Sequence, residues 1–141
     1  MAALTGLKWG RIIVAAIAIE LVLFAVIIPW NFVPNGAVVA LYLTIPACLV
    51  ITFFAARWAA SKAQGQFVLH GLLVGVLAAL MYWAIIQAAP AALPIVYIVA
   101  NYLKLLAGAA GGYAAPPSLA HLSAPVDTAP AACQIHAEKH D

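Results

Sequence analysis

The chain has 141 residues, of which 67% are hydrophobic and only 7% are charged, and its formal net charge is +2. This composition excludes an ordinary soluble domain, because soluble chains carry about 25% charged residues. The small positive charge gives no indication of a nucleic-acid partner. We therefore expect an integral membrane protein whose first partner is the lipid bilayer.

Four long apolar segments follow one another along the chain. A helix needs about 20 apolar residues to cross a bilayer, and segments of this kind lie at about residues 11–32, 37–56, 67–88 and 93–114. All four are expected to be helices, since a single segment in lipid must satisfy its own backbone hydrogen bonds. The predicted fold is an all-α, antiparallel bundle of four transmembrane helices within residues 1–114.

The first segment carries a carboxylate, Glu20, near its middle. A charge in hydrocarbon costs at least a few kcal/mol and is normally retained for a partner or a function. Lys8 and Arg11 precede this segment as they would in a signal peptide, but the segment is too long and lacks an Ala-x-Ala-like end. We expect it to be a retained helix.

The second segment contains a proline, Pro46, at mid-membrane depth. Proline cannot donate a backbone hydrogen bond, so the carbonyl of Tyr42 loses its helical partner. We expect a kink there, with Thr44 a candidate to satisfy the backbone. Two interpretations stay open, a harmless kink that improves packing and a hinge or site at the break.

Orientation follows from the positive charges in the short loops. Arg57 and Lys62 lie between the second and third segments, on the same side as Lys8 and Arg11, whereas the other two short loops have no Lys or Arg. Positively charged loops are retained in the cytoplasm. We therefore predict a multi-pass protein of the inner (plasma) membrane with both termini in the cytoplasm.

Small residues form smooth surfaces on the third and fourth segments. Gly71 and Gly75 make a small-xxx-small pattern, and the fourth segment ends with Gly108, Gly111 and Gly112. Such surfaces let membrane helices approach closely. They predict helix packing contacts, and we expect some of this surface to meet another subunit.

A histidine, His70, lies about one turn inside the third segment. A buried imidazole can ligate a pigment, but the sequence has no second intramembrane histidine for a bis-histidine haem. The favoured alternative is an interfacial histidine whose polar edge faces lipid headgroups or Arg57. The sequence requires no cofactor.

The fourth segment carries the second intramembrane charge, Lys104. Tyr97, Asn101 and Lys104 recur at spacings of four and three residues, which places them on one helical face. At a rise of about 1.5 Å per residue, Glu20 and Lys104 both lie about 14 Å from the cytoplasmic ends of their helices. We expect them to pair in the bundle interior, with Asn101 and either Tyr97 or Tyr102 supplying hydrogen bonds.

Residues 115–141 differ in composition, being rich in Ala, Pro, Ser and His. Such a stretch has too few bulky apolar residues to fold alone, so we predict a disordered cytoplasmic tail. Cys133, His136 and His140 are spaced to share a helical face and would suit a soft or borderline metal. A fourth ligand is missing, and accidental spacing is the favoured alternative.

Two functions remain compatible with these features. The chain has no phosphate-binding loop, nucleophile elbow or His-Glu-x-x-His motif, so we do not expect an enzyme. The favoured function is a noncatalytic structural or accessory subunit that associates with itself or with a larger membrane complex. The alternative is a small oligomeric transporter or channel that uses Glu20 and Lys104 for proton or ion coupling.

Overall fold

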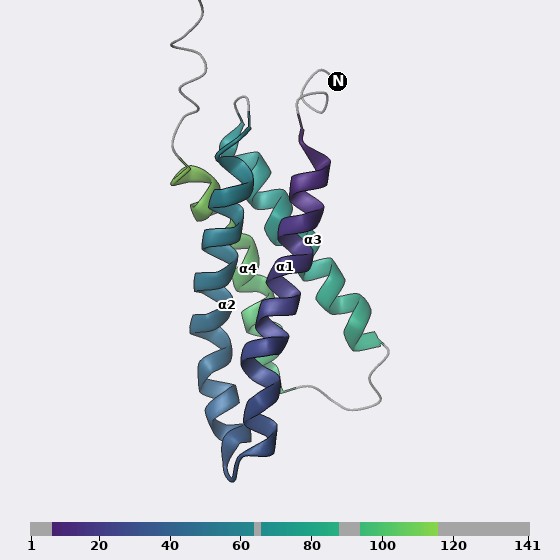
Figure 1. The fold of residues 1–141 in the computed structure, drawn as a ribbon, viewed down its shortest axis with the longest axis vertical. Helices are drawn as coiled ribbons and strands as arrows, with labels where there is room; N and C mark the ends of the chain where they lie inside the picture. The colour runs from purple at the N-terminus through teal and green to yellow at the C-terminus, as the bar shows by residue number, and fades with distance from the viewer. Residues whose placement is uncertain (1–6, 64–65, 88–93, 116–141) are drawn as a thin grey trace, which may run out of the picture.

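The computed structural model describes residues 7–63, 66–87 and 94–115, and these residues are almost entirely helical (Figure 1). In chain order the elements are α1 (Trp9–Ile27), the short 3-10 helix η2 (Ile28–Phe32), α2 (Gly36–Ala60), α3 (Phe67–Gln87) and α4 (Ile95–Tyr113). Each α-helix, with η2 continuing α1, is long and apolar enough to cross a membrane. The prediction of four such helices is confirmed.

The end of α2 differs from the predicted boundary. The sequence placed it near residue 56, whereas the helix continues to Ala60, so Arg57 lies in its last turn and not in a loop. No glycine or proline interrupts the chain in this turn. A cation there also interacts favourably with the negative end of the helix dipole.

The proline in α2 does not end the helix. Pro46 lies inside α2, and its side chain is exposed on the outer surface of the bundle. The Thr44 hydroxyl donates to the carbonyl oxygen of Ala40 at 2.7 Å, so it does not serve the carbonyl of Tyr42 as expected. A threonine in a helix bonds most easily one turn back, and for Thr44 that acceptor is Ala40.

A tight connection joins η2 to α2. Asn35 has a left-handed backbone with φ of 59°, a conformation that asparagine tolerates better than most residues. At Gly36, a Cβ atom would overlap the backbone carbonyl of Trp30. Only glycine fits this position, which fixes the start of α2 beside the end of α1.

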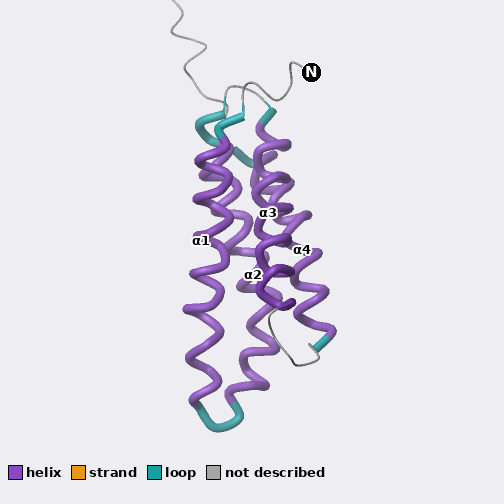
Figure 2. Tube along the Cα trace, turned by 90° about the vertical axis from the view of Figure 1, so that its right-hand side faces the viewer, coloured by secondary structure: helices purple, strands orange, loops and turns teal. Residues whose placement is uncertain are grey.

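The four helices form a bundle in which α1 and α4 occupy opposite positions. Both α1 and α4 pack against α2 and α3, but no Cα atom of α1 lies within 8 Å of α4 in the described part of the chain. The hairpin of α1 and α2 also extends beyond α3 and α4 at the end where η2 lies (Figures 1 and 2). Any contact between α1 and α4 must therefore be made by long side chains across the centre.

The predicted glycine surfaces lie at contacts within the chain. On α3 and α4, Gly75 faces the carbonyl of Lys104, Gly71 faces that of Gly108, and Gly112 lies against the start of α3. Gly111 instead faces α2. Because a Cβ atom at each position would meet backbone or a buried side chain, these surfaces are occupied by the chain's own helices.

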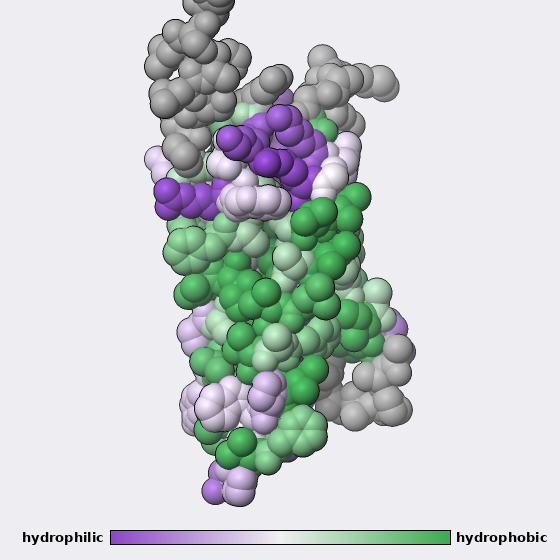
Figure 3. Space-filling view, viewed as in Figure 1, coloured by the Kyte–Doolittle hydropathy of each residue, from purple (hydrophilic) through white to green (hydrophobic). Residues whose placement is uncertain are grey.

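The outer surface of the bundle is apolar. Leu21, Val38, Phe54, Leu80 and Leu106, one or two from each long helix, are all exposed. Figure 3 shows a broad hydrophobic belt, with hydrophilic residues gathered mainly at the end where α1 begins. Soluble proteins rarely expose such large continuous apolar surfaces.

Candidate functional site

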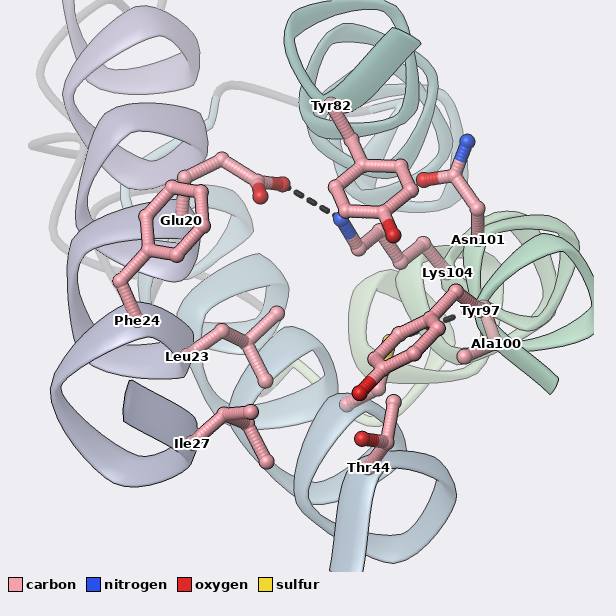
Figure 4. Close-up of a pocket in the computed structure, with 11 residues that line it drawn as sticks. Glu20, Leu23, Phe24, Ile27, Thr44, Tyr82, Tyr97, Ala100, Asn101 and Lys104 are labelled. Atoms are coloured by element: carbon pink, nitrogen blue, oxygen red, sulfur yellow. Dashed lines mark hydrogen bonds and ion pairs between the residues drawn. The ribbon is translucent and has the colours of Figure 1, made fainter. Parts of the chain in front are cut away.

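A buried ion pair joins Glu20 of α1 to Lys104 of α4. The ammonium nitrogen of Lys104 donates to Oε1 of Glu20 at 2.5 Å. The two residues are only 4% and 2% exposed, respectively. Since their helices lie on opposite sides of the bundle, the two side chains meet across its centre (Figure 4).

The aromatic ring of Tyr82 on α3 covers this pair. The Lys104 ammonium lies over the ring, 4.7 Å from its centroid, which is a cation–π distance. Tyr82 was not among the residues predicted at the site, although the sequence contains a signal for it. Tyr82 continues the small-residue face of α3, because Gly71, Gly75, Ala78 and Tyr82 follow at spacings of four, three and four residues.

The polar neighbours on α4 take positions different from those expected. Asn101 is buried and its amide nitrogen donates to the carbonyl of Ala79 on α3 at 3.3 Å, so it joins two helices and does not bond to the pair. Its amide oxygen is buried without a hydrogen-bond partner among the described residues. Tyr97 lines a neighbouring pocket, and Tyr102 is exposed on the outer surface.

A pocket of about 120 Å³ lies beside the pair. Glu20 and Lys104 form one end, and the walls are mainly apolar side chains such as Leu23, Phe24 and Ile27 of α1 (Figure 4). These α1 residues follow Glu20 in the sequence. The pocket therefore extends from the pair toward the end of the bundle where η2 lies.

A cysteine that was not predicted to belong to the site also lines this pocket. Cys48 is buried on α2, and its thiol donates to the carbonyl of Ala100 on α4 at 3.2 Å. The bond ties the two helices together next to the pair. The sequence signal was the shared face of α2, where Thr44, Cys48 and Thr52 recur every four residues.

On its opposite side the pair meets closely packed protein. Ile12, Ala16 and Ile19 of α1 and Val74 of α3 are fully buried between the pair and the start of α1. The backbone of α3 also lies close to that of α4 at Gly75 and at the glycine one turn before it. The described residues thus leave the charges accessible mainly from the pocket side.

His70 lies away from the pair and is held by the backbone. It is buried, its Nε2 accepts a hydrogen bond from the backbone N–H of Lys8 at 3.4 Å, and its Nδ1 donates to the carbonyl of Gln66 at 3.1 Å. Because Lys8 can only donate here, the proton of the neutral ring belongs on Nδ1. Because both ring nitrogens are hydrogen-bonded, a pigment could bind only by replacing one of these hydrogen bonds. The ring also does not face headgroups or Arg57 as expected.

The metal-ligand hypothesis concerns a part of the chain that the structure does not describe. Cys133, His136 and His140 lie outside the described residues, as does the predicted tail from residue 116 onward. That hypothesis therefore stays a prediction.

The candidate site consists of Glu20, Lys104, Tyr82, Asn101 and the adjoining pocket.

Comparison with known proteins provides no relative for this site. The chain matches none of the protein-family models, curated proteins or solved structures with which it was compared. Function is therefore inferred from the residues and their geometry.

Proposed function

We propose that the chain is a multi-pass protein of the inner (plasma) membrane that acts as a noncatalytic structural or accessory subunit. Its four helices cross the bilayer in alternating directions, with both termini in the cytoplasm. The apolar outer surface supports insertion in lipid. Lys8, Arg11, Arg57 and Lys62 all lie near one end of the bundle, which supports the orientation.

One observation supports the accessory role most strongly. The only two charges in the middle of the described helices neutralise each other. Glu20 and Lys104 satisfy each other inside a single chain, and packed side chains cover them on one side. A buried pair of this kind fixes which helices face each other, because an unpaired partner would be costly. The pair therefore serves as an internal lock, and partner subunits contact the outer surface.

Purification of the full chain in mild detergent tests this role. We expect other membrane subunits to co-purify with the chain. Substitutions on the outer surface should remove these subunits, whereas substitutions in the pocket should not. A lone homo-oligomer that has no further subunit and conducts protons or ions would favour the alternative, an oligomeric transporter or channel.

The pocket beside the ion pair makes the transporter or channel alternative worth testing. The pocket reaches the ion pair from one side and could form half of a proton or ion pathway. Purified protein in proteoliposomes should nevertheless pass no protons under an imposed gradient, because the other side is packed. Proton flux that Glu20→Gln abolishes would replace the accessory proposal with the transport alternative.

A further inference from the structure

An apolar groove lies on the outer surface of the bundle, between α2 and α4. It has a volume of about 450 Å³, and its walls include Phe53 and Phe54 of α2 and Leu106 and Ala110 of α4. Phe54 and Leu106 are 60% and 66% exposed. The groove is therefore open to whatever surrounds the bundle, which is lipid in the membrane location proposed above.

Small residues on α4 create this groove. A Cβ atom on Gly111 would overlap the backbone carbonyl of Phe53, so α4 lies very close to α2 there. Ala107 and Ala110 line the groove with short side chains. On the opposite wall, the large rings of Phe53 and Phe54 pack edge to face with their centroids 5.4 Å apart. Short side chains opposite large ones leave a space that the two helices do not fill.

A cation lies at the end of the groove nearest the cytoplasmic ends of α2 and α4. Arg57 follows Phe54 by three residues and Tyr113 follows Ala110 by three, so each lies one turn beyond the groove on the same side of its helix. Gly111 lies against the backbone nitrogen of Arg57, which places the two helix ends level with each other (Figure 1). Both Arg57 and Tyr113 are exposed. They form the mouth of the groove.

Arg57 has no anionic partner in the part of the chain that the structure describes. Glu20 is the only carboxylate there, and it pairs with Lys104. The planar guanidinium of an arginine binds phosphate through two parallel hydrogen bonds. The phenol of Tyr113 can donate to the same group. The mouth of the groove therefore suits a phosphate.

The length of the groove suits one acyl chain. Leu49 lines it eight residues before Arg57, which is about 12 Å along a helix. The hydrocarbon of one leaflet is about 15 Å thick, half of a bilayer core of about 30 Å. A lipid whose phosphate lies at Arg57 can thus place a chain along the groove without leaving its leaflet.

We propose that this groove binds an anionic glycerophospholipid of the cytoplasmic leaflet, an inference that rests on the proposed membrane location and orientation. The phosphate accepts hydrogen bonds from Arg57 and Tyr113, and one acyl chain lies between Phe54 and Leu106. Van der Waals contact with the walls holds the chain. The charge of Arg57 selects an anionic headgroup over a zwitterionic one.

Quenching of tryptophan fluorescence by brominated lipids tests this selection. In the full chain, Phe54→Trp places a groove reporter after the four native tryptophans are replaced by phenylalanine, at Trp9, Trp30, Trp58 and Trp83. The protein is reconstituted in phosphatidylcholine vesicles with increasing fractions of dibrominated phosphatidylglycerol or dibrominated phosphatidylcholine. We expect the phosphatidylglycerol to quench the groove reporter at a several-fold lower fraction than the phosphatidylcholine.

Val14→Trp in the same tryptophan-free chain is the control reporter. Val14 is exposed on α1 and lies three residues from Arg11, as Phe54 lies three residues from Arg57. It therefore has a cation at the same spacing but is not a residue of the groove. Its preference for phosphatidylglycerol should be much smaller.

Two substitutions separate the charge from the groove. Arg57→Gln should reduce the preference at the groove reporter to that of the control reporter, while Arg57→Lys should keep part of it. Ala110→Phe leaves Arg57 in place but fills the groove from an exposed position, so it should weaken quenching by phosphatidylglycerol several-fold. Both positions are exposed, so the bundle should still fold.

Four results would overturn the lipid site. Equal quenching of the groove reporter by the two lipids would show that Arg57 selects nothing. An equally strong preference at the control reporter would show only a general attraction of anionic lipid to this end of the bundle. Protection of the groove reporter alone from both lipids would show that protein, such as a second copy of the chain, fills the groove. Absence of quenching at both reporters would contradict the membrane location itself, and the lipid site with it.

Discussion

Gly75 of α3 lies directly against the carbonyl oxygen of Lys104 on α4. A Cβ atom on Gly75 would come within 2.5 Å of that oxygen, closer than any ordinary contact. The close approach of the two helices thus fixes the backbone from which the buried lysine reaches across to Glu20. Helix packing and the ion pair are parts of one arrangement.

Gly75→Ala should therefore destabilise the bundle. The added methyl group meets backbone that cannot rotate away, and overpacking of this kind costs about 1–3 kcal/mol. Gly10→Ala is the matched control, because a Cβ atom there meets nothing within 4 Å, and alanine favours the helix. Free energies of unfolding in micelles measure both. Equal stability of the two variants would contradict the close contact at Gly75.

Tyr82 should act through its ring face and not through its hydroxyl. The Lys104 ammonium lies over the ring, so Tyr82→Phe should keep nearly the full free energy of unfolding. Tyr82→Leu removes the ring and should cost about 1–2 kcal/mol for a desolvated cation–π contact. The same unfolding measurement compares the two variants. A loss that is as large in Tyr82→Phe as in Tyr82→Leu would assign the effect to the hydroxyl.

Hydropathy predicts the helices of this protein but not how each is rotated about its axis. Long apolar runs locate α1 to α4 within a few residues, except that α2 ends one turn later. In a soluble helix the polar face shows which side is outside. Here nearly every face is apolar, so only rare polar residues mark the interior. That is why Tyr97, Asn101 and Lys104 could be placed on one face.

The contacts that could not be predicted from the sequence are those that depend on which helices are neighbours. The depth of Glu20 and Lys104 follows from counting residues, but counting does not reveal that α1 and α4 lie opposite each other. The positions of His70 and Tyr82 also depend on this arrangement. His70 meets the backbone of Lys8 only because the start of α1 lies beside the start of α3.

The topology proposal predicts which positions react from outside the cell. In a chain with Cys48 and Cys133 replaced by serine, Pro34→Cys should react with a membrane-impermeant maleimide in intact cells. Pro34 is an exposed turn residue, and it avoids the left-handed backbone of its neighbour Asn35. Lys62→Cys, exposed at the other end of α2, should react only after permeabilisation. The reverse pattern would invert the orientation.

The ion pair should show strong coupling in a double-mutant cycle. Glu20→Gln or Lys104→Met alone leaves a buried charge without its partner, which costs about 3–5 kcal/mol. The double variant removes both charges and should recover part of that loss, because the remaining groups are neutral. The free energies of unfolding of the wild type, the two single variants and the double variant, measured under one condition, give the coupling energy. Additive losses would mean that the two side chains stabilise the bundle independently, whereas a large coupling energy would identify the pair as the lock between α1 and α4.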